Sequence, residues 1–579
     1  MQDMEQATPR RGVRDGDMKV KLYSNQKGVS LIAAIFIIVI LAFMGLMFVS
    51  LIGTSSFTSV NDMQSAQALY VAEGGAENAV ILLNTSTLAS RIACANVTGN
   101  ANLTAAPLGQ GQFNVTADAG SPFYSFAPTT LNGAVTSAAT TITVNSTAGY
   151  AASGRIMIDR ELMDYSGITP GTTITFAVLR GRDGTIAAAH ANGAPVGQYQ
   201  CSVTSSGAIP TIAAPTAQRT VQEGIQLQEG WAVGAGPTML RWNGTAWSAV
   251  GLPAGANQTL NSVSILSYAD AWVVGNNGAG GAGLCTNGRI LRWNGSSWAC
   301  VASPINQILR SVFMISSQDG WAVGNAGGVG QRPVILQWNG NVWILNNSGL
   351  VINEDLYGVY MLDTNNNGIA DDGLAVGTRR GCANPGPTIL RWNGAAWACP
   401  AGLPGATADV DLNAVFMVSA IDAWAVGAGG TIVRLSGAAW STPASGVAVA
   451  LNSVYMLDIN GDGVADDGWA VGVASGAKPT MLRWNIPCAG GAGTNTWNNC
   501  TALAIVPAIN VALNGVHCVD ANDCWAVGNN SAGEFIIHWD GTTWTRVGPS
   551  GGIPNVSLLE VYVIGPKQRP QAAWQETFP

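Results

Sequence analysis

Two short segments of the chain place oxygen-bearing side chains at regular intervals. Asp363–Gly373 and Asp458–Gly468 are nearly the same string, with Asp or Asn at positions 1, 3, 5 and 9 and Gly at position 6. A sharp turn at the glycine gathers such oxygens around one point, and oxygen ligands are those that Ca²⁺ prefers. Carboxylates held this close repel one another unless a cation offsets their charge. The spacing therefore predicts two calcium sites, with solvated turns as the alternative.

The two segments begin like an EF-hand loop but lack its bidentate Glu at position 12. They resemble instead the shorter D-x-[DN]-x-[DN]-G-x-x-D loops of extracellular calcium proteins. Asp372 and Asp467, which follow position 9, would add or replace a ligand. The predicted ligand sets are Asp363, Asn365, Asn367, Ile369, Asp371 and Asp372 in the first loop, and Asp458, Asn460, Asp462, Val464, Asp466 and Asp467 in the second.

The composition argues against several other kinds of chemistry. Only 3 of the 579 residues are His, and charged residues make up 10% of the chain, with a net charge of −8. Such a chain cannot build the basic face that nucleic-acid binding requires, so no nucleic-acid partner is expected. A hydrophobic content of 47% excludes a disordered protein. No set of convergent acids and bases is evident, and we expect no enzymatic activity.

A tetrad of the type Trp-Ala-Val-Gly recurs seven times at intervals of 41 to 56 residues. The copies start at Trp231, Trp272, Trp321, Leu374, Trp424, Trp469 and Trp525. A second signature follows most copies, as in Trp242-Asn-Gly-Thr-Ala-Trp247, and an extended segment such as Leu260–Val263 precedes most of them. Asn-Gly between two apolar runs is a tight hairpin turn. Four short strands per repeat make one propeller blade, so residues 229–579 predict a seven-bladed β-propeller.

The first copy lacks its leading strand, and the chain end offers a replacement in Leu558–Ile564. We therefore expect this segment to join the first blade and latch the ring. The alternatives are a truncated eighth blade ending at Trp574 and an open solenoid.

The blade motif resembles that of sialidase-like and photosystem-assembly-factor propellers. Asp540 and Gly541 are adjacent, unlike in a true sialidase Asp box, and no Arg triad or Tyr–Glu pair can be identified. The resemblance therefore implies the fold without the catalysis. We interpret the repeated Trp residues as blade cores, with sugar stacking as the alternative.

Ten Cys residues are expected to form five disulfides in an oxidising compartment. Two of the pairs recur at equivalent places in the second and fourth copies of the repeat. A zinc site is the alternative, although no CxxC occurs. The predicted pairs are Cys94–Cys201, Cys285–Cys300, Cys382–Cys399, Cys488–Cys500 and Cys518–Cys524.

The N-terminus carries a basic segment followed by an apolar one. Residues 1–28 include six Lys or Arg, and the run from Val29 to Gly53 has no charge. As a helix at ~1.5 Å per residue, this run is long enough to cross a bilayer core. The basic flank should remain cytoplasmic and the rest of the chain should lie outside. An ordinary signal anchor and a cleaved secretory signal are alternatives.

The junction Gln26-Lys27-Gly28-Val29-Ser30-Leu31-Ile32 resembles the prepilin signal of type IV pilins. The stretch Ser65–Glu77 is similar to the helix of PilX-type minor pilins. The resemblance implies cleavage after Gly28 by a prepilin peptidase, methylation of Val29, and a helix that packs among other pilin subunits. It also implies a place in the inner membrane before assembly and at the cell surface, in the pilus, afterwards. Type IV pilins usually carry Glu at the fifth mature position, and here that residue is Ala33.

Minor pilins that lack this Glu resemble tip subunits, so we expect a position at the filament tip. The alternative is that the position is simply relaxed in PilX-like proteins. The helix should run over 29–90, with 29–53 in the membrane or filament core. Alternating segments at 91–123 and 198–228 predict a pilin β-domain.

Residues 124–197 interrupt this β-domain with short strands separated by Gly, Pro and Ser. Their end, Arg180 to Ala194, resembles small β-modules of surface and phage-tail proteins. His190 has no second His or Cys near it in sequence, so we interpret it as structural rather than as a ligand.

The sequence thus predicts a mainly β protein with a long N-terminal α-helix. A pilin-like domain with an inserted small β-module precedes a seven-bladed β-propeller. The expected function is that of a minor pilin, at the tip, displaying the propeller for adhesion to a surface, glycan or protein ligand. The alternative is a membrane-anchored periplasmic propeller acting as a glycan hydrolase or assembly factor.

Overall fold

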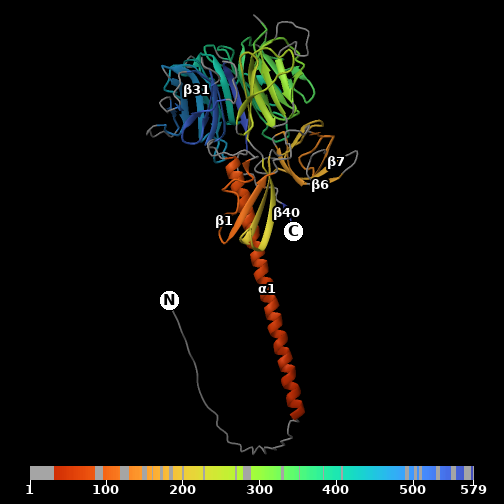
Figure 1. Ribbon diagram of the computed structural model, residues 1–579. Coiled ribbons are helices and arrows are strands. Elements are labelled where there is room, and N and C mark those ends of the chain that lie inside the picture. The colour runs from red at the N-terminus through yellow and green to blue at the C-terminus, as the bar shows by residue number, and fades with distance from the viewer. Residues whose placement is uncertain are drawn as a thin grey trace, which may run out of the picture. The chain divides into compact units, whose positions relative to one another are not determined.

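The computed structural model describes residues 31–577 with gaps, the longest of which are 85–95, 118–128, 147–152, 182–186, 278–288, 489–494, 530–534, 549–555 and 566–574. Helix α1 (Leu31–Asn84) opens the described chain (Figure 1). The chain divides into two compact units, Met1–Gln64 and Ser65–Pro579.

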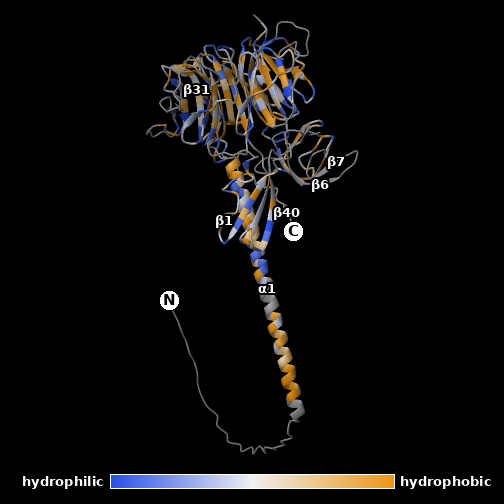
Figure 2. Cartoon of the chain, viewed as in Figure 1, coloured by the Kyte–Doolittle hydropathy of each residue, from blue (hydrophilic) through white to orange (hydrophobic). Residues whose placement is uncertain are grey.

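The first unit contains the N-terminal part of α1, which exposes its apolar side chains. Between Ile35 and Leu51 the large hydrophobic residues are 43% to 77% exposed. Figure 2 shows this part of the helix dominated by hydrophobic residues. Within the described side chains, no helix is both long and apolar enough to span a membrane. The predicted span, 29–53, extends beyond those side chains at both ends.

In the second unit, the C-terminal part of α1 packs against a five-stranded antiparallel sheet. Its order is β1 (Ala106–Leu108), β2 (Gly111–Ala117), β9 (Cys201–Pro210), β10 (Pro215–Ile225) and β40 (Gln575–Thr577). Ala68, Val71, Ala79 and Leu83 of the helix are buried against this sheet. The last strand of the chain thus pairs with β10, which precedes the propeller.

Two glycines allow the helix and sheet to approach closely. A Cβ at Gly75, in the C-terminal part of α1, would overlap the ring of Phe113 and the hydroxyl of Ser205. A Cβ at Gly207, in β9, would overlap the backbone of Ala68 and Ala72. Gly inside a helix lowers the helix stability by about 1 kcal/mol relative to Ala. At Gly75 the close packing of helix and sheet offsets this loss.

A six-stranded sheet lies between β2 and β9 in the chain. Its order is β3 (Thr129–Thr130), β8 (Pro195–Gln198), β5 (Ser153–Ile158), β6 (Glu161–Thr169), β7 (Ile174–Leu179) and β4 (Thr141–Val144). Leu131, Ile156, Met163 and Val196 belong to its core. We call this segment, 129–198, the module.

The described residues of 229–564 form seven sheets, and the predicted propeller is confirmed. Each contains four antiparallel strands, which we number 1 to 4 from the channel outward and which follow the sequence order in blades 2 to 7. Blade 2 is β14 (Leu260–Ser267), β15 (Asp270–Gly275), β16 (Arg289–Trp293) and β17 (Trp298–Val301); blade 3 is β18 (Leu309–Met314), β19 (Gly320–Gly324), β20 (Val334–Trp338) and β21 (Trp343–Leu345); blade 4 is β22 (Leu356–Leu362), β23 (Asp372–Gly377), β24 (Thr388–Trp392) and β25 (Trp397–Ala398).

The remaining blades follow the same plan. Blade 5 is β26 (Leu412–Ser419), β27 (Asp422–Gly427), β28 (Ile432–Ser436) and β29 (Ala439–Ser441); blade 6 is β30 (Leu451–Leu457), β31 (Asp467–Ser475), β32 (Lys478–Trp484) and β33 (Trp497–Asn499); blade 7 is β35 (Leu513–Asp520), β36 (Asp523–Gly528), β37 (Phe535–Trp539) and β38 (Trp544–Arg546). In blade 7, β34 (Ile505–Val506) adds a parallel fifth strand to β38.

The ring closes through the chain end, as predicted. Blade 1 consists of β11 (Glu229–Gly234), β12 (Thr238–Trp242) and β13 (Trp247–Ala249), and β39 (Leu558–Ile564) supplies its strand 1. Trp231 pairs with Tyr562 and Ala232 with Val561 in antiparallel register. Pairing the two ends of the ring leaves no open inner edge.

The strands that carry the Trp-Ala-Val-Gly tetrads are buried on both faces. Every residue of β15, β27 and β36 is buried. A neighbouring blade covers each face, which explains why these strands read as continuous apolar runs without alternation.

Tryptophans fill the seams between blades. Each tetrad Trp packs against the two Trp residues of strands 3 and 4 in the next blade, with ring centroids 4.6–5.6 Å apart. The residues of these triads are at most 7% exposed. For the tryptophans of these triads, the interpretation as blade cores is therefore confirmed. Their burial leaves no ring face for stacking on a sugar.

Candidate functional site

Each blade carries a buried acid two residues before its tetrad Trp or Leu. In blade 2 this acid is Asp270, which binds Arg292 of strand 3 at 2.7 Å. The arrangement recurs in all seven described blades with a polar partner from strand 3. The pairs are Glu229–Arg241, Asp270–Arg292, Asp319–Gln337, Asp372–Arg391, Asp422–Arg434, Asp467–Arg483 and Asp523–His538.

In blades 1, 2, 5 and 6 the arginine of the pair also stacks on tryptophan. Arg434 lies 4.4 Å from the ring centroid of Trp424 in its own blade and 5.1 Å from that of Trp484 in the next. A buried cation is tolerated here because it meets a carboxylate on one side and ring faces on the other. Sequence reasoning missed this repeat, although the acid at a fixed distance before each tetrad was visible in the sequence.

The repeat corrects the predicted roles of Asp372 and Asp467. Both are buried, and each forms a two-point ion pair with arginine, at 2.8 and 2.6 Å to Arg391 and at 2.9 and 2.7 Å to Arg483. Each carboxylate also accepts the N–H of the following glycine. These two acids are members of the blade pairs, which leaves them unsuited as calcium ligands.

The other predicted ligands share one hydrogen-bonding pattern in both loops. In the first loop, Asp363 accepts the N–H groups of Asn367 and Gly368, and Asn367 accepts that of Ile369. In the second, Asp458 accepts those of Asp462 and Gly463, and Asp462 accepts that of Val464. The acids at position 9, Asp371 and Asp466, accept N–H groups from positions 2 and 3.

These bonds change the argument for calcium. Among the described residues, no group of three or more His, Cys, Asp or Glu is placed to hold a metal ion. Backbone N–H groups offset much of the repulsion between the carboxylates, so the turns do not depend on a cation. The donors Asp363, Asn365, Asn367 and Asp371 are nevertheless of the oxygen type that Ca²⁺ takes. Calcium binding thus stays a prediction.

Each loop also braces the preceding blade. The carbonyl of Gly368 accepts the hydroxyl of Ser316 at 2.7 Å, and the N–H of Ala370 donates to Asp319 at 2.8 Å, both in blade 3. The second loop repeats these contacts in blade 5, where Gly463 meets Ser419 at 2.6 Å and Ala465 meets Asp422 at 2.8 Å. The loops therefore tie blade 4 to blade 3 and blade 6 to blade 5.

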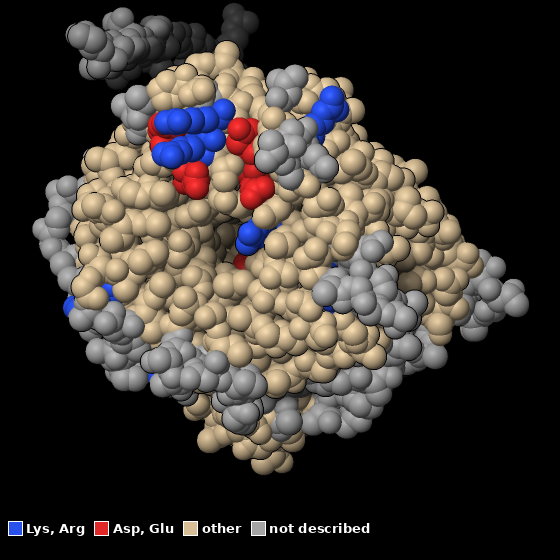
Figure 3. Space-filling model, turned by 90° about the horizontal axis from the view of Figure 1, so that it is seen from above, with Lys and Arg blue, Asp and Glu red and all other residues tan. Residues whose placement is uncertain are grey.

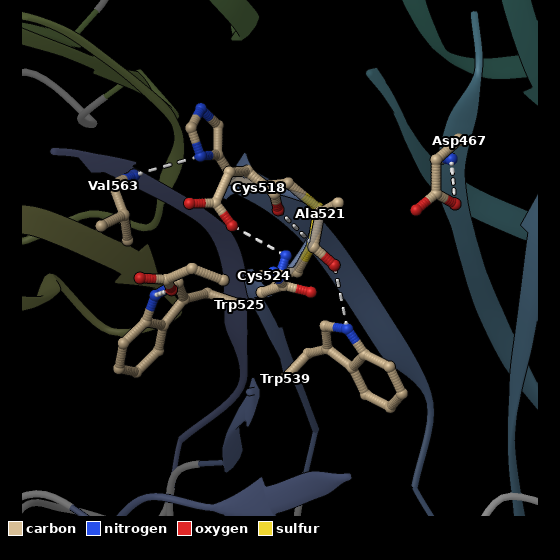
Figure 4. The surroundings of a disulfide bond; sticks show 12 residues. Asp467, Cys518, Ala521, Cys524, Trp525, Trp539 and Val563 are labelled. Carbon is tan, nitrogen blue, oxygen red and sulfur yellow. Dashed lines mark hydrogen bonds between the residues drawn. A yellow bond between two sulfur atoms is a disulfide. The ribbon is translucent and has the colours of Figure 1, made fainter. Parts of the chain in front are cut away.

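Three predicted disulfides are present, namely Cys382–Cys399, Cys488–Cys500 and Cys518–Cys524. Figure 4 shows Cys518–Cys524 beside Trp525 and Trp539, whose indole N–H donates to the carbonyl of Ala521. Cys300 is also disulfide-bonded. Cys94, Cys285 and the side chain of Cys201 lie outside the described residues, as do Gly28, Val29 and the side chain of Ala33.

The inner strands line a central channel, and side-chain amides link their starts. Asn261, Asn413, Asn452 and Asn514 each donate to the leucine carbonyl that begins the next inner strand, at 2.7–2.8 Å. At the same position, blades 3 and 4 carry Arg310 and Tyr357, whose guanidinium lies 5.8 Å from the phenol ring. At blades 3 and 4, this segment of the channel mouth therefore presents a guanidinium and a phenol where four other blades present an amide.

Charged loop residues surround that segment. Asp355 accepts the N–H of Ala326, Asp411 accepts that of Arg379, and Arg380 pairs with Asp409 at 2.7 Å. Burial, together with Asp411 and Asp355, raises the pKa of Tyr357. Figure 3 shows a hollow along the propeller axis, with acidic and basic side chains gathered on one side of its mouth. We call Arg310, Asp355, Tyr357, Arg380 and Asp411 the charged rim.

One acid lies in the seam between the latch strand and blade 2. Glu560 of β39 accepts the N–H of Val263 at 3.1 Å, and burial raises its pKa to about 7. Ser262, Ser311 and Ser453 take the same role in other seams, at 3.1–3.3 Å. Sequence reasoning placed Glu560 in the latch strand but assigned it no role.

No protein-family model and no curated protein matches this sequence. Among solved structures, YCF48 from Cyanidioschyzon merolae is similar at 14% identity and a TM-score of 0.38, over 55% of this chain and 98% of that one. A structure described as YCF48 bound to D1 peptide has 16% identity and a TM-score of 0.37, over 56% and 91%. The WD40 β-propeller domain of Doa1 has 12% identity and a TM-score of 0.35, over 57% and 88%. The propeller fold of this chain is established by its own strand pairing.

Proposed function

We propose that this protein is a minor pilin that carries a β-propeller for adhesion or partner binding outside the cell. The observation that carries the proposal is the difference in side-chain exposure between the two parts of α1. Its N-terminal part exposes apolar side chains from Ile35 to Leu51, while its C-terminal part is buried against a sheet. Exposed apolar surface of this extent calls for a lipid or protein partner. Neighbouring pilin helices provide such a partner in a filament, and the inner membrane provides it before assembly.

The proposed cleavage site, Gly28–Val29, gives the direct test. Filaments sheared from cells should contain the chain beginning at Val29 with a methylated N-terminus, detectable by mass spectrometry of the N-terminal peptide. The variant Gly28→Leu should keep residues 1–28 and be missing from filaments. A wild-type chain that retains its leader and stays in the envelope would support the alternative, a membrane-anchored propeller protein.

The tip position rests on Ala33, where type IV pilins usually have Glu. An unpaired carboxylate in an apolar filament core is costly, so a subunit without it suits a place that has no neighbour above. Immunogold labelling of the propeller on isolated filaments should mark filament ends. Uniform labelling along the shaft would contradict the tip position while leaving the pilin assignment intact.

The charged rim is the proposed contact surface for the unknown ligand. Its residues are concentrated at blades 3 to 5 in a chain of which only 10% is charged, and Arg310 and Tyr357 replace the asparagines found at this position in blades 2, 5, 6 and 7. A glycan array and a host-surface binding assay with full-length protein in detergent would identify the ligand. The double variant Arg310→Asn, Tyr357→Asn restores the amide and should weaken binding at least about 10-fold, a change worth about 1.4 kcal/mol.

Calcium is proposed as the ion of the two long loops, held by the oxygens of Asp363, Asn365 and Asp371 in the first and of Asp458, Asp462 and Asp466 in the second. A bound cation would stiffen loops that already brace blades 3 and 5. Saturating Ca²⁺ should stabilise the full chain against denaturant by about 1–3 kcal/mol. The variant Asp458→Asn, Asp462→Asn should reduce that gain, and an unchanged unfolding midpoint with Ca²⁺ or EDTA would contradict it.

A further inference from the structure

A cluster of buried charges joins the module to the propeller. Asp159 lies in the turn between β5 and β6, Glu161 begins β6, Arg180 follows β7, and His190 lies before β8. Asp159, Glu161 and His190 are 4%, 2% and 1% exposed. Buried charges are costly unless each meets a partner, so the geometry of this cluster determines whether the module stays docked.

The imidazole of His190 lies between two carboxylates. Its Nδ1 is 2.6 Å from Oδ2 of Asp159, and its Nε2 is 2.8 Å from Oε2 of Glu161. Ionised carboxylates only accept hydrogen bonds, and a neutral imidazole has one N–H to donate. Both contacts can therefore be hydrogen bonds only when the ring carries two protons and a positive charge.

Glu161 is fixed from several sides. Arg180 donates to both of its oxygens at 2.7 and 2.6 Å, and the N–H groups of Gly181 and Ala188 donate to it as well. Burial alone would raise the pKa of Glu161, but the hydrogen bonds, that from Arg180 foremost, lower it to about 2. Glu161 thus stays ionised, and the charges of Asp159, Glu161, Arg180 and protonated His190 cancel.

The second oxygen of Asp159 reaches the propeller. Oδ1 accepts the backbone N–H of Ser317 at 2.7 Å, in the turn between β18 and β19 of blade 3. The Asp270–Arg292 pair of blade 2 lies within electrostatic range of Asp159 and has no net charge. Asp159 is therefore shared between His190 in the module and Ser317 in the propeller.

We propose that His190 and Asp159 form a pH-dependent latch, in which the protonated imidazole holds Asp159 in place to dock the module on blade 3. Loss of the proton leaves a ring nitrogen lone pair facing a carboxylate and a net negative charge in a buried site. Either change moves Asp159 away from the backbone N–H of Ser317. The module then releases the propeller while both remain folded.

The direction of the pH dependence follows from the same contacts. Burial disfavours the charged ring, but the hydrogen bonds to Asp159 and Glu161 outweigh it and raise the pKa of His190 above its ordinary value of 6.5. A group whose pKa is raised by docking contributes its full stabilisation below 6.5 and loses it as the pH rises through the raised value. The latch is therefore closed below the raised pKa of His190 and opens as the pH rises through it.

Hydrogen exchange measured by mass spectrometry on the full chain in detergent tests the latch. After correction for the intrinsic pH dependence of exchange, peptides covering Ser317 and the β5–β6 turn should exchange at least about 10-fold faster at pH 9 than at pH 6, which equals about 1.4 kcal/mol of docking free energy. The equivalent turn of blade 5, Ser419–Asp422, bonds to the propeller loop at Gly463 and Ala465 and serves as the internal control. Equal protection of the Ser317 peptide at both pH values would overturn the proposal.

Two variants separate the latch from general stability. Asp159→Asn keeps an oxygen for Ser317 and offers His190 an N–H, so a neutral ring is accommodated and docking should persist at pH 9. His190→Gln should exchange fast near Ser317 at both pH values. Groups outside the latch, such as Glu560, remain in both variants, so pH dependence that persists in both would come from them and would also overturn the proposal.

Discussion

The seam between blades 4 and 5 differs from the other six seams of the described propeller. Six seams are each filled by three tryptophans, as at Trp321, Trp392 and Trp397 between blades 3 and 4. The remaining seam contains Leu374 and Leu435, at 1% and 2% exposure, with Trp440 only partly buried. Apolar burial closes both kinds of seam, but only the first kind gains the added energy of stacked and edge-on rings.

The difference teaches that the seam, rather than the blade, is the unit that the repeat sequence specifies. Leu374 replaces the Trp of the fourth tetrad, and the residues that would contact it belong to the fifth copy, where Leu435 also replaces a Trp. Leu374 and Leu435 lie in different copies of the repeat, yet they belong to the same buried cluster. A tryptophan at either position alone would have only Trp440 nearby as a tryptophan partner, where the other seams supply two.

Truncating a seam tryptophan should have the largest effect. Trp397 of blade 4 and Trp440 of blade 5 occupy the same position in strand 4, but Trp397 is 5% exposed and Trp440 is partly exposed. Trp397→Ala should destabilise the propeller by about 3–5 kcal/mol, because it leaves a cavity between two other tryptophans. Trp440→Ala should cost about 1 kcal/mol, since a half-exposed ring loses less apolar contact.

Urea unfolding of the full chain in detergent, followed by circular dichroism, would rank the two variants. The ratio of their effects is more robust than either value, because the two side chains have equal size. Equal shifts of the unfolding midpoint would mean that the Leu-containing seam is packed as tightly as the others.

Restoring a single tryptophan gives the second prediction. Leu374→Trp should destabilise by about 1–3 kcal/mol, because the seam is already filled by Leu435, Val415 and Met417. The double variant Leu374→Trp, Leu435→Trp should not recover this loss unless neighbouring residues repack. A stabilising single substitution, seen as a higher unfolding midpoint, would show that the seam holds unused space.

Much of this fold could be predicted from sequence because its signals are local and repeated. Tetrads, Asn-Gly turns and the unpaired Leu558–Ile564 were sufficient to predict seven blades and their closure. Three cysteine pairs followed from equivalent positions or short separation and are present. Repetition turns a weak local signal into a strong one, since each copy tests the others.

The parts that sequence reasoning missed depend on contacts between distant segments. Asp372 was interpreted as part of a calcium loop because it follows Asp371, whereas its partner Arg391 lies on the neighbouring strand. His190 was interpreted as structural for lack of a second His or Cys, and its partners, the acids Asp159 and Glu161, were not identified. Long-range ion pairs leave no periodic pattern in a single copy of a module.

Blade 3 provides the last and smallest prediction, because it keeps its tryptophans but has an uncharged amide, Gln337, in place of the arginine. Asp319 binds Gln337 at 2.9 Å where five other blades offer an arginine, and burial raises the pKa of this carboxyl. A raised carboxyl pKa means that the ionised form costs stability at neutral pH and that the cost disappears on acidification.

Gln337→Arg should therefore stabilise the full chain by about 1 kcal/mol at pH 7, the modest net gain expected when desolvation offsets part of a buried pair. The gain should shrink towards pH 4 as the raised pKa of Asp319 is approached. Arg434→Gln, which removes the cation from blade 5, is the matched reverse change and should destabilise more, because Arg434 also stacks on Trp424 and Trp484. Unfolding midpoints in urea at the two pH values would measure both. A pH-independent effect of Gln337→Arg would mean that packing of the longer side chain, rather than its charge, distinguishes the blades.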